Sequence, residues 1–291
     1  MELRHDAWHD PACRAALITL FDRVWPRLAG RERHAAALGF PWSTISTSTV
    51  VWDGGRVLAH AGLLELPMHL GGTAVRVGGI HAVCTDPDHR RKGLAAQVLA
   101  RAVAFGAERH PLLMLGTDVP DVYRPWGFRD VQSHQFVLDR AGPGGGEGWR
   151  RIVHSADPDI AHWLRLLATR VPLSDQVSFC DRGPVNVFDM VGPDGGCGPL
   201  YYCAALDVVT YAESVGEDLV VHDIVAAGPF DVDALLAGSP FPHRRIRFNL
   251  NVDRLNLPVR VEPRVYDGMW MVRGPFIGDH TAWALPPYSE C

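Results

Sequence analysis

The sequence predicts an α/β (α+β) fold in which a mostly antiparallel sheet is flanked by helices, followed by a second domain with a similar order of elements. Two observations predict it. One is a run of strands that leads through a turn into a helix, and the other is the return of this order after residue 148. The first strands are rich in Val, Ile and Thr and are separated by Gly-Gly turns, as in an antiparallel meander; they cover 47–52, 56–66 and 73–85.

Two helices are expected before the meander. Asp10 and Pro11 form an N-cap followed by a proline in the first turn, and the apolar residues after them fall on one helical face: Leu17, Leu20, Phe21, Val24 and Trp25. A second helix is expected over 31–38, because Gly39 and Pro41 end it.

A longer helix is expected after the meander, from Leu94 to Glu108, where apolar residues recur at helical spacing. A strand follows from Leu112 to Thr117, and a short helix is then expected to end at Gly127. Phe128 to Leu138 is expected to close the first domain as a strand or a hairpin.

The turn between the last meander strand and the long helix has the composition of an anion site. Three consecutive cations, Arg90, Arg91 and Lys92, precede Gly93, which allows a ligand to approach the backbone closely. The first amides of the helix have no partner inside the helix, and the helix dipole is positive at that end. The turn therefore predicts a pyrophosphate site, with a solvated basic turn as the alternative.

Two motifs in this order resemble the GNAT superfamily of acyl-CoA-dependent N-acyltransferases over about 46–138: Arg90-x-x-Gly93-x-Ala95 and, after the next strand, Tyr123-x-x-x-Gly127-Phe128. The resemblance implies a mixed, mostly antiparallel GNAT sheet, with acetyl-CoA as the acyl donor and a small-molecule amine as the acceptor. It also implies that the first helices and their connection line the acceptor side of the cleft.

The resemblance implies a set of contacts to acetyl-CoA. The three cations of the turn would neutralise the pyrophosphate, and the amides from Gly93 to Ala96 would bind its oxygens. Arg91 and Ala95 fill places that are often glycine in the family, which narrows the turn. In this family, splayed strands admit the pantetheine arm at the loop that 118–119 occupies here. The expected contacts are Val83, Cys84, Thr85, Arg90, Arg91, Lys92, Gly93, Leu94, Ala95, Ala96, Asp118 and Val119, and no metal site is expected.

Catalytic roles follow from the resemblance as well. Tyr123 matches the family's tyrosine and would protonate the leaving thiolate, while backbone N–H groups near Val83 and Thr85 would stabilise the oxyanion where the strand bulges. A base must accept the proton of an amine with a pKa of about 10.4. We prefer His81, because strand alternation gives it the same facing as Thr85. The candidates are His60, Glu65, His69 and His81, each of which can equally be a surface or hydrogen-bonded side chain.

A stretch rich in glycine and proline predicts the domain boundary. We expect a catalytic domain at 1–140, a linker at 141–148 and a second domain at 149–291. The second domain repeats the first in outline, with a helix after Asp157-Pro158, a strand at 185–191, further strands from Leu200 to Thr210 and Leu219 to Ala226, a short helix at 234–237, and closing strands at 246–250, 259–266 and 269–273.

The second domain lacks a basic turn. Asp231 and Asp233 stand where the first domain has cations, so a pyrophosphate would be repelled, and we expect this copy to bind no cofactor. An active domain followed by a degenerate copy resembles the tandem-GNAT group that includes the Eis-type aminoglycoside acetyltransferases. Those proteins usually carry a third domain whose terminal carboxylate reaches the active site, and this sequence has no room for one after the second domain.

Composition and charge indicate a cytoplasmic enzyme. With 291 residues, 47% of them hydrophobic, the chain can build two cores, and its net charge of -5 argues against bulk nucleic-acid binding. No apolar run approaches the ~20 residues of a transmembrane helix, and the N-terminal residues do not form a signal peptide. The six cysteines show no Cys-x-x-Cys pair, which favours free thiols in a reducing compartment. A homo-oligomer is compatible with the sequence.

The sequence thus predicts an N-acetyltransferase that acts on a small-molecule primary amine by direct attack, with aminoglycosides and other polyamines as the leading acceptors from the tandem resemblance. A protein or peptide amine is the alternative acceptor, and a relay through Cys84 is the alternative route. Two other classes stay open: a non-catalytic acyl-CoA sensor or ligand-sequestering protein, and a docking module. In the docking module, four tryptophans that can equally fill the second core would anchor a partner: Trp149, Trp163, Trp270 and Trp283.

Overall fold

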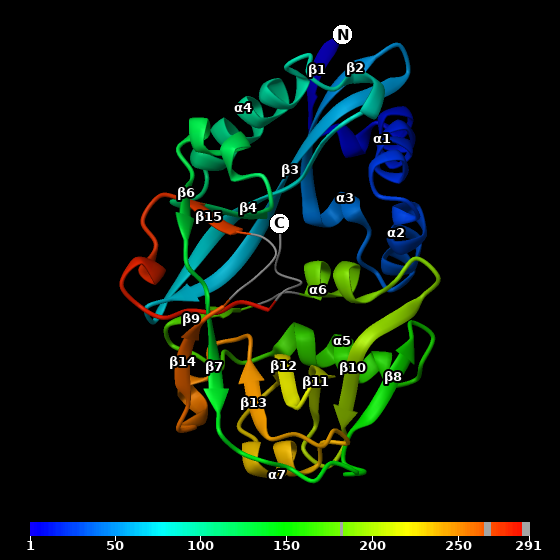
Figure 1. The fold of residues 1–291 in the computed structure, drawn as a ribbon. Helices are drawn as coiled ribbons and strands as arrows, with labels where there is room; N and C mark the ends of the chain where they lie inside the picture. The colour runs from blue at the N-terminus through cyan, green and yellow to red at the C-terminus, as the bar shows by residue number, and fades with distance from the viewer. Residues whose placement is uncertain (181–182, 265–268, 287–291) are drawn as a thin grey trace.

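The computed structural model describes residues 1–180, 183–264 and 269–286 and shows two sheets with helices around and between them (Figure 1). Within these residues the first sheet has eight strands, seven in the order β1-β2-β3-β4-β5-β15-β6 and β9 paired with β3. Their bounds are β1 Glu2–His5, β2 Ser46–Asp53, β3 Arg56–Leu70, β4 Thr73–Thr85, β5 Leu112–Thr117, β6 Arg129–Val131, β9 Val177–Phe179 and β15 Met269–Arg273.

Helices cover both faces of the first sheet. Helix α4 (Leu94–Ala107) packs on one face, and α1 (Pro11–Val24) and α2 (Leu28–Ala37) lie on the other, joined to β2 by the short α3 (Trp42–Ile45) (Figure 1). As expected, Asp10 caps α1: its carboxylate accepts hydrogen bonds from the amides of Ala12 and Cys13 at 2.9 and 3.3 Å.

The second sheet has seven strands among the described residues, in the order β14-β7-β13-β12-β11-β10-β8. Its strands are β7 His134–Leu138, β8 Arg150–His154, β10 Gly196–Cys203, β11 Val208–Val215, β12 Asp218–Ala226, β13 Arg245–Phe248 and β14 Arg260–Pro263, and its helices are α5 Ile160–Thr169, α6 Gly183–Met190 and α7 Val232–Ala237. The last two residues of the strand expected over 259–266 lie outside the described residues.

The two sheets repeat one another strand for strand. Each has one parallel pair at the same place, β4 with β5 and β12 with β13, and the remaining pairs are antiparallel. Counted from β1 in the first sheet and from β8 in the second, the third and fourth strands lose register at one point, β3–β4 after His60 and β11–β12 after Tyr211. The repeat establishes an α+β fold with two mixed, mostly antiparallel sheets.

Each sheet also contains one strand from the other half of the chain. Strand β15 lies between β5 and β6 in the first sheet, and β7 lies between β13 and β14 in the second. The expectation that 128–138 closes the first domain is therefore wrong for its second part. Only Gln132 and Ser133 separate β6 from β7, and the chain continues into the second sheet instead of turning back.

The exchange places large aromatic residues between the sheets. Trp270 and Trp283 pack together in a core cluster that also contains residues of β3, β4 and β5. The tryptophans named as docking anchors are core residues, since they are 6%, 1%, 4% and 0% exposed: Trp149, Trp163, Trp270 and Trp283. They form no exposed cluster, so the structure gives a docking module no support.

The strand expected at 185–191 is also wrong, because residues 185–190 lie in α6 and Val191 follows the helix. A short apolar run rich in valine fits a strand and a buried helix equally well, and packing decides between them. Here Phe188 packs edge-on against Trp42 with 4.4 Å between ring centroids, and Val187 and Val191 enter the same core. Helix α6 therefore brings the second half of the chain onto the open side of the first sheet (Figure 1).

The glycine-rich stretch at 141–148 packs against the second domain through backbone hydrogen bonds. Gly142 exchanges two backbone hydrogen bonds with His243, at 2.9 and 3.0 Å, and Gly145 donates to Pro240 at 3.0 Å. At the turn expected to lack a cofactor, Asp231 accepts a hydrogen bond from the Ala234 amide and Asp233 pairs with Arg140. Both carboxylates thus have structural partners. In the described part of the chain, no helix is long and apolar enough to cross a bilayer, and the five cysteines there are free.

Candidate active site

Strand β4 bulges at Ala82. Cys84 pairs with His60 and His81 pairs with Gly62, so two residues of β4 lie opposite the single residue Ala61 of β3. Ala82 adopts a left-handed backbone with φ of 47°. The extra residue reverses strand alternation beyond it, so the expected common facing of His81 and Thr85 does not hold.

Buried hydrogen bonds hold this bulge in place. His60 Nδ1 lies 2.7 Å from the carbonyl oxygen of Ala82, and His60 Nε2 lies 2.9 Å from Ser48 Oγ. Burial lowers the pKa of His60 to about 4, so the imidazole is neutral and can donate from one nitrogen and accept at the other. His60, one of the four base candidates, is therefore a structural partner of the bulge.

Beyond the bulge, β4 separates from β5. The two strands pair only over Val77–Gly79 of β4 and Leu112–Met114 of β5, while β15 pairs with the opposite edge of β5. The Asp86 amide bonds the Leu58 carbonyl at 2.9 Å, so antiparallel alternation directs the Thr85 amide away from β3 and toward the gap. A gap lined by unpaired strand amides is suited to bind an extended polar chain and a developing oxyanion.

The basic turn lies at the end of this gap. Arg91 and Gly93 both adopt left-handed backbones, with φ of 61° and 74°, and no side chain caps the first amides of α4. The three cations of the turn are exposed, and among the described residues none of them forms an ion pair: Arg90, Arg91 and Lys92. Ala95 and Ala96 lie in the first turn of α4, while the side chain of Leu94 is buried beneath it.

The carboxylate of Asp86 anchors the start of the turn. It accepts hydrogen bonds from the Asp88 amide at 3.0 Å and from His89 Nδ1 at 3.1 Å, and it pairs with Arg23 of α1. Burial alone would raise the pKa of Asp86, but these hydrogen bonds and the guanidinium charge outweigh it and lower the pKa. The anchoring carboxylate is therefore ionised at neutral pH.

Tyr123 lies at the other wall of the gap. It sits between two short 3₁₀ turns, η3 (Pro120–Val122) and η4 (Arg124–Trp126), and packs in the same cluster as Val83 and Phe128. Burial raises its pKa to about 12, although a hydrogen bond with Thr117 acts in the opposite direction. The phenol thus keeps its proton at neutral pH, as a general acid must.

The remaining residues expected at the donor side differ in exposure. Asp118 and Val119 are exposed at the mouth of the gap, with Val119 at 51%. Cys84 is buried, and burial raises the pKa of its thiol well above the usual value. A thiol that keeps its proton is a poor nucleophile, so the environment disfavours a relay through Cys84.

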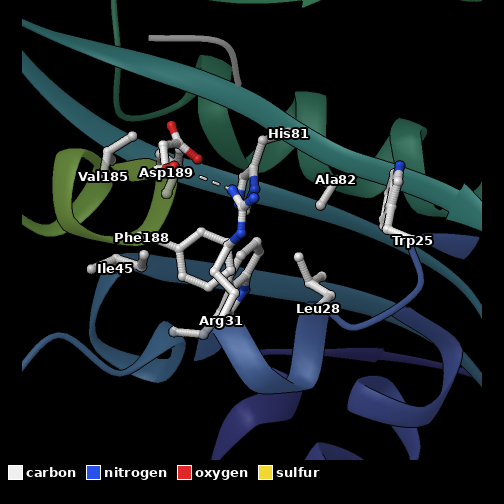
Figure 2. A pocket seen from close by; sticks show the side chains of 11 residues that line it. Trp25, Leu28, Arg31, Ile45, His81, Ala82, Val185, Phe188 and Asp189 are labelled. Atoms are coloured by element: carbon white, nitrogen blue, oxygen red, sulfur yellow. Dashed lines mark hydrogen bonds between the residues drawn. The ribbon is translucent and has the colours of Figure 1, made fainter. Parts of the chain in front are cut away.

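A cavity of about 290 Å³ adjoins the bulge on the side opposite α4. Figure 2 shows its labelled residues, with Arg31 reaching in from α2 and His81 entering from β4. The lining comes from the residue that follows α1 and from α2, α3, β3, β4 and α6: Trp25, Leu28, Arg31, Trp42, Ile45, Leu64, His81, Ala82, Val185, Phe188 and Asp189.

His81 is the base candidate that reaches this cavity. Its Nε2 lies 2.7 Å from Ser46 Oγ, and burial, followed by the neighbouring His60, holds its pKa well below the usual value. Gly62 is required beside it, because a Cβ at that position would collide with the imidazole. Glu65 and His69 do not line the cavity, and Glu65 is exposed with Arg76 Nη1 at 3.5 Å.

Sequence reasoning missed most of the cavity. Arg31 was expected only as the start of a helix, and Trp42 followed a predicted helix break. Phe188 and Asp189 come from α6, which was expected to be a strand of the other domain. The resemblance placed the acceptor side at the first helices, but no sequence signal indicated the contribution of α6.

Comparisons with known proteins match this architecture. Residues 17–130 match the family model described as an acetyltransferase (GNAT) domain. Among curated protein sequences, no significant match to the chain was found.

Solved structures match nearly the whole chain at low sequence identity. A GCN5-related N-acetyltransferase from Kribbella flavida is 18% identical, with a TM-score of 0.53, and the match covers 93% of this chain and 70% of that one. Eis1 from Mycobacterium abscessus is 15% identical, with a TM-score of 0.52 and 96% and 74% covered. A conserved protein of unknown function from Enterococcus faecalis is 12% identical, with a TM-score of 0.58 and 94% and 71% covered.

At these identities the likeness concerns the fold, and it extends over both sheets. The matched residues include those that form the bulge, the gap and the basic turn. Residues 17–130 are therefore similar to the GNAT acetyltransferase domain, and a second sheet with the same strand order follows them.

Proposed function

We propose that the protein transfers an acetyl group from acetyl-CoA to the primary amine of a small molecule, by direct attack of the amine on the thioester. One observation carries the proposal: the bulge at Ala82 lies between a gap that ends at a basic turn and a cavity on the other side of the strand. A donor in the gap and an acceptor in the cavity would meet at the bulge. This arrangement places the two reactants in one site without a covalent enzyme intermediate.

The basic turn holds the donor. Arg90, Arg91 and Lys92 neutralise the pyrophosphate, and the uncapped amides from Gly93 to Ala96 bind its oxygens. The pantetheine arm runs between β4 and β5 past Val119, and the thioester carbonyl points to the Thr85 amide.

The residues at the bulge then supply the acid and the base. The amine nitrogen bonds the acetyl carbon and loses a proton to His81, while the Thr85 amide stabilises the oxyanion. When Nε2 of His81 donates to Ser46, Nδ1 holds the lone pair that accepts this proton. The carbon–sulfur bond breaks as Tyr123 donates its proton to the thiolate.

The cavity compensates for a weak base. A low pKa makes His81 neutral at pH 7, but it also makes the imidazole a poor proton acceptor. Apolar walls and the positive charge of Arg31 destabilise an ammonium group in the same cavity, which lowers the pKa of the acceptor amine as well. The amine therefore gives up its proton more readily than it would in water.

Two alternatives concern the route and the class of function. A relay through Cys84 is disfavoured by the raised pKa of its buried thiol. A non-catalytic acyl-CoA sensor would bind the donor at the same turn and show no turnover. The tandem resemblance keeps aminoglycosides and other polyamines among the acceptors to be tested.

The test is release of free coenzyme A thiol from acetyl-CoA across a panel of amines: aminoglycosides, polyamines, aromatic amines, amino acids and lysine peptides. Tyr123→Phe should lower kcat by about tenfold or more, the order expected for a lost general acid, whereas Tyr201→Phe in the second sheet serves as the matched control. Cys84→Ala should keep turnover, because direct attack needs no thiol.

Loss of all turnover in Cys84→Ala would establish the relay instead. Tight acetyl-CoA binding with no turnover on any amine would favour the sensor. Absence of acetyl-CoA binding in the wild type would overturn the assignment of the basic turn and, with it, the proposed function.

A further inference from the structure

The walls of the acceptor cavity are mainly apolar and aromatic. Trp42, Phe188 and Leu64 are 6%, 6% and 4% exposed and form its floor together with Val185, while Trp25 remains 39% exposed beside the cavity. Such walls bind a flat or branched apolar body by removing it from water. They offer few hydrogen-bond partners to a sugar, whose hydroxyl groups would be left unpaired.

The size of the cavity also favours a compact acceptor over a large polar one. Small-molecule pockets commonly span about 300 to 1,000 Å³, so 290 Å³ lies at the lower limit. A single-ring molecule fits within this volume, whereas a multi-ring aminoglycoside would leave most of its surface outside.

The charges in the cavity are equally selective. Arg31 reaches into it, and its only hydrogen bond among the described residues is to the backbone carbonyl of Asp189, at 3.4 Å (Figure 2). No ion pair of Arg31 is found in the described part of the chain, and burial keeps His81 neutral. The Asp189 carboxylate also lines the cavity, but it has a further interaction within the chain. Arg31 is thus a guanidinium near apolar walls without a paired anion.

We propose that the acceptor is a primary amine with a compact apolar or aromatic body and a carboxylate, which Arg31 binds. This inference rests on the proposed function, and it narrows the acceptor class that the tandem resemblance suggested. With the amine at the bulge near Ala82 and the apolar body against Trp42 and Phe188, the carboxylate meets the guanidinium. A second ammonium group at that place would instead be repelled.

Matched acceptors test the proposal. Benzylamine and para-(aminomethyl)benzoate share the amine and the ring and differ in the carboxylate, and spermidine and kanamycin supply the polycations. We expect kcat/KM for the benzoate to exceed that for benzylamine by about tenfold, the size of a charge-assisted hydrogen bond, and to exceed those for both polycations.

Variants assign the preference to the cavity. In Arg31→Leu the ratio of the two kcat/KM values should fall toward one, and Arg31→Lys should restore part of it, because a lysine keeps the charge but loses the bidentate geometry. Arg33→Leu is the matched control on the exposed part of the same helix and should keep the wild-type ratio. Phe188→Ala should weaken both aromatic acceptors, since it removes part of the shared wall.

The outcomes separate this inference from the proposed function. Turnover of polycations with none of the aromatic amines would overturn the inference and leave the proposed function standing. A preference that Arg31→Leu does not change would also overturn it. If no amine is turned over, calorimetric titration of para-(aminomethyl)benzoate into the CoA-bound protein still decides: saturable binding that Arg31→Leu weakens at least about tenfold supports it, and absent binding overturns it.

Discussion

His60 on β3 supports the carbonyl of Ala82 on β4 through a hydrogen bond of 2.7 Å, so one buried imidazole fixes the point at which β4 leaves regular pairing. His60 Nε2 lies 2.9 Å from Ser48 Oγ on β2, and the imidazole packs edge-on against the ring of Phe21 on α1, with 4.9 Å between the ring centroids. His60 does not line the cavity. It is a positioning residue for the bulge, and through it for the Thr85 amide.

Replacing His60 should therefore affect chemistry more than donor binding. In His60→Leu the Ala82 carbonyl and the Ser48 hydroxyl lose their partners, which we expect to cost about 1–3 kcal/mol of unfolding free energy. We expect kcat to fall about tenfold or more with a smaller change in the KM for acetyl-CoA. Steady-state kinetics and urea unfolding measure the two effects. His60→Asn, which can still donate to a carbonyl, should recover part of kcat, and equal kcat in the wild type and His60→Leu would disprove the role.

Buried neutral histidines also predict the direction of the pH dependence of stability. The pKa of His60 is lowered to about 4 and that of His81 well below its usual value, while the unfolded chain protonates near 6.5. The unfolded state then binds more protons, so the contribution is present above pH 6.5 and is lost as pH falls toward 4. For His60 alone the loss between pH 7.5 and pH 5 is about 2 kcal/mol.

Urea unfolding at several pH values measures this contribution. His60→Asn should flatten the dependence relative to the wild type, whereas His9→Asn, which changes an exposed histidine, should not. An identical dependence in His60→Asn and in the wild type would show that His60 does not titrate in this way.

The sequence could predict the parts of the fold that local pattern determines. Strand β4, Thr73–Thr85, and the start of α4 at Leu94 agree with their expected bounds, because a Gly-Gly turn, a proline and the glycine before the helix mark these limits locally. The basic turn and Tyr123 were predicted as site residues for the same reason, since each belongs to a short motif with a fixed place beside a strand or helix, and their roles stay predictions.

The sequence-based predictions that were wrong concern features that depend on residues distant in the chain. The segment around Phe188 is helical because Phe188 packs against Trp42, and no local pattern within 185–191 indicates this contact. The facing of His81 differs from the expected one because a bulge adds one residue to β4. Strand β15 joins the first sheet beside β5 although 151 residues (118–268) separate the two strands in the chain. The cavity combines these long-range features, so its apolar lining could not be derived from sequence.

The exchanged strands should make the two halves of the chain depend on each other. In the first sheet, Met271 and Val272 of β15 are both 0% exposed between β5 and β6. Residues 1–148 alone would lack this strand and expose two apolar edges, so we expect the fragment to show no cooperative unfolding and no acetyl-CoA binding. The same holds for 149–291, which would lack β7. Co-expression of the two fragments should restore binding, because each then supplies the strand that the other lacks.

Point variants within β15 test the same dependence in the full chain. Met271→Ala removes a fully buried side chain and should cost about 2–5 kcal/mol of unfolding free energy. Met269→Ala, on the same strand but 37% exposed, is the matched control and should cost far less. Thermal unfolding compares the two variants. A fragment 1–148 that unfolds cooperatively and binds acetyl-CoA would contradict the predicted dependence.

The basic turn offers a variant that separates charge from backbone conformation. Arg91 adopts a φ of 61°, a left-handed conformation that costs a residue with a side chain about 1–2 kcal/mol and that glycine adopts freely. Arg91→Gly should therefore keep or slightly raise the thermal stability, because relief of this strain offsets the greater entropy of glycine in the unfolded chain. It also removes one exposed cation, so we expect the KM for acetyl-CoA to rise several-fold at low salt.

The salt dependence of the KM for acetyl-CoA shows whether its rise in Arg91→Gly comes from the lost charge. The Debye length falls from about 10 Å at 0.1 M to about 3 Å at 1 M, so the KM values of Arg91→Gly and the wild type should converge as salt increases. Arg91→Lys keeps the positive charge and still places a side chain at the left-handed backbone position. Its KM for acetyl-CoA should therefore stay close to that of the wild type at every salt concentration. A KM difference between Arg91→Gly and the wild type that high salt leaves unchanged would show that the arginine acts through the shape of the turn, and the pyrophosphate would then depend on the amides of α4 and the two remaining cations.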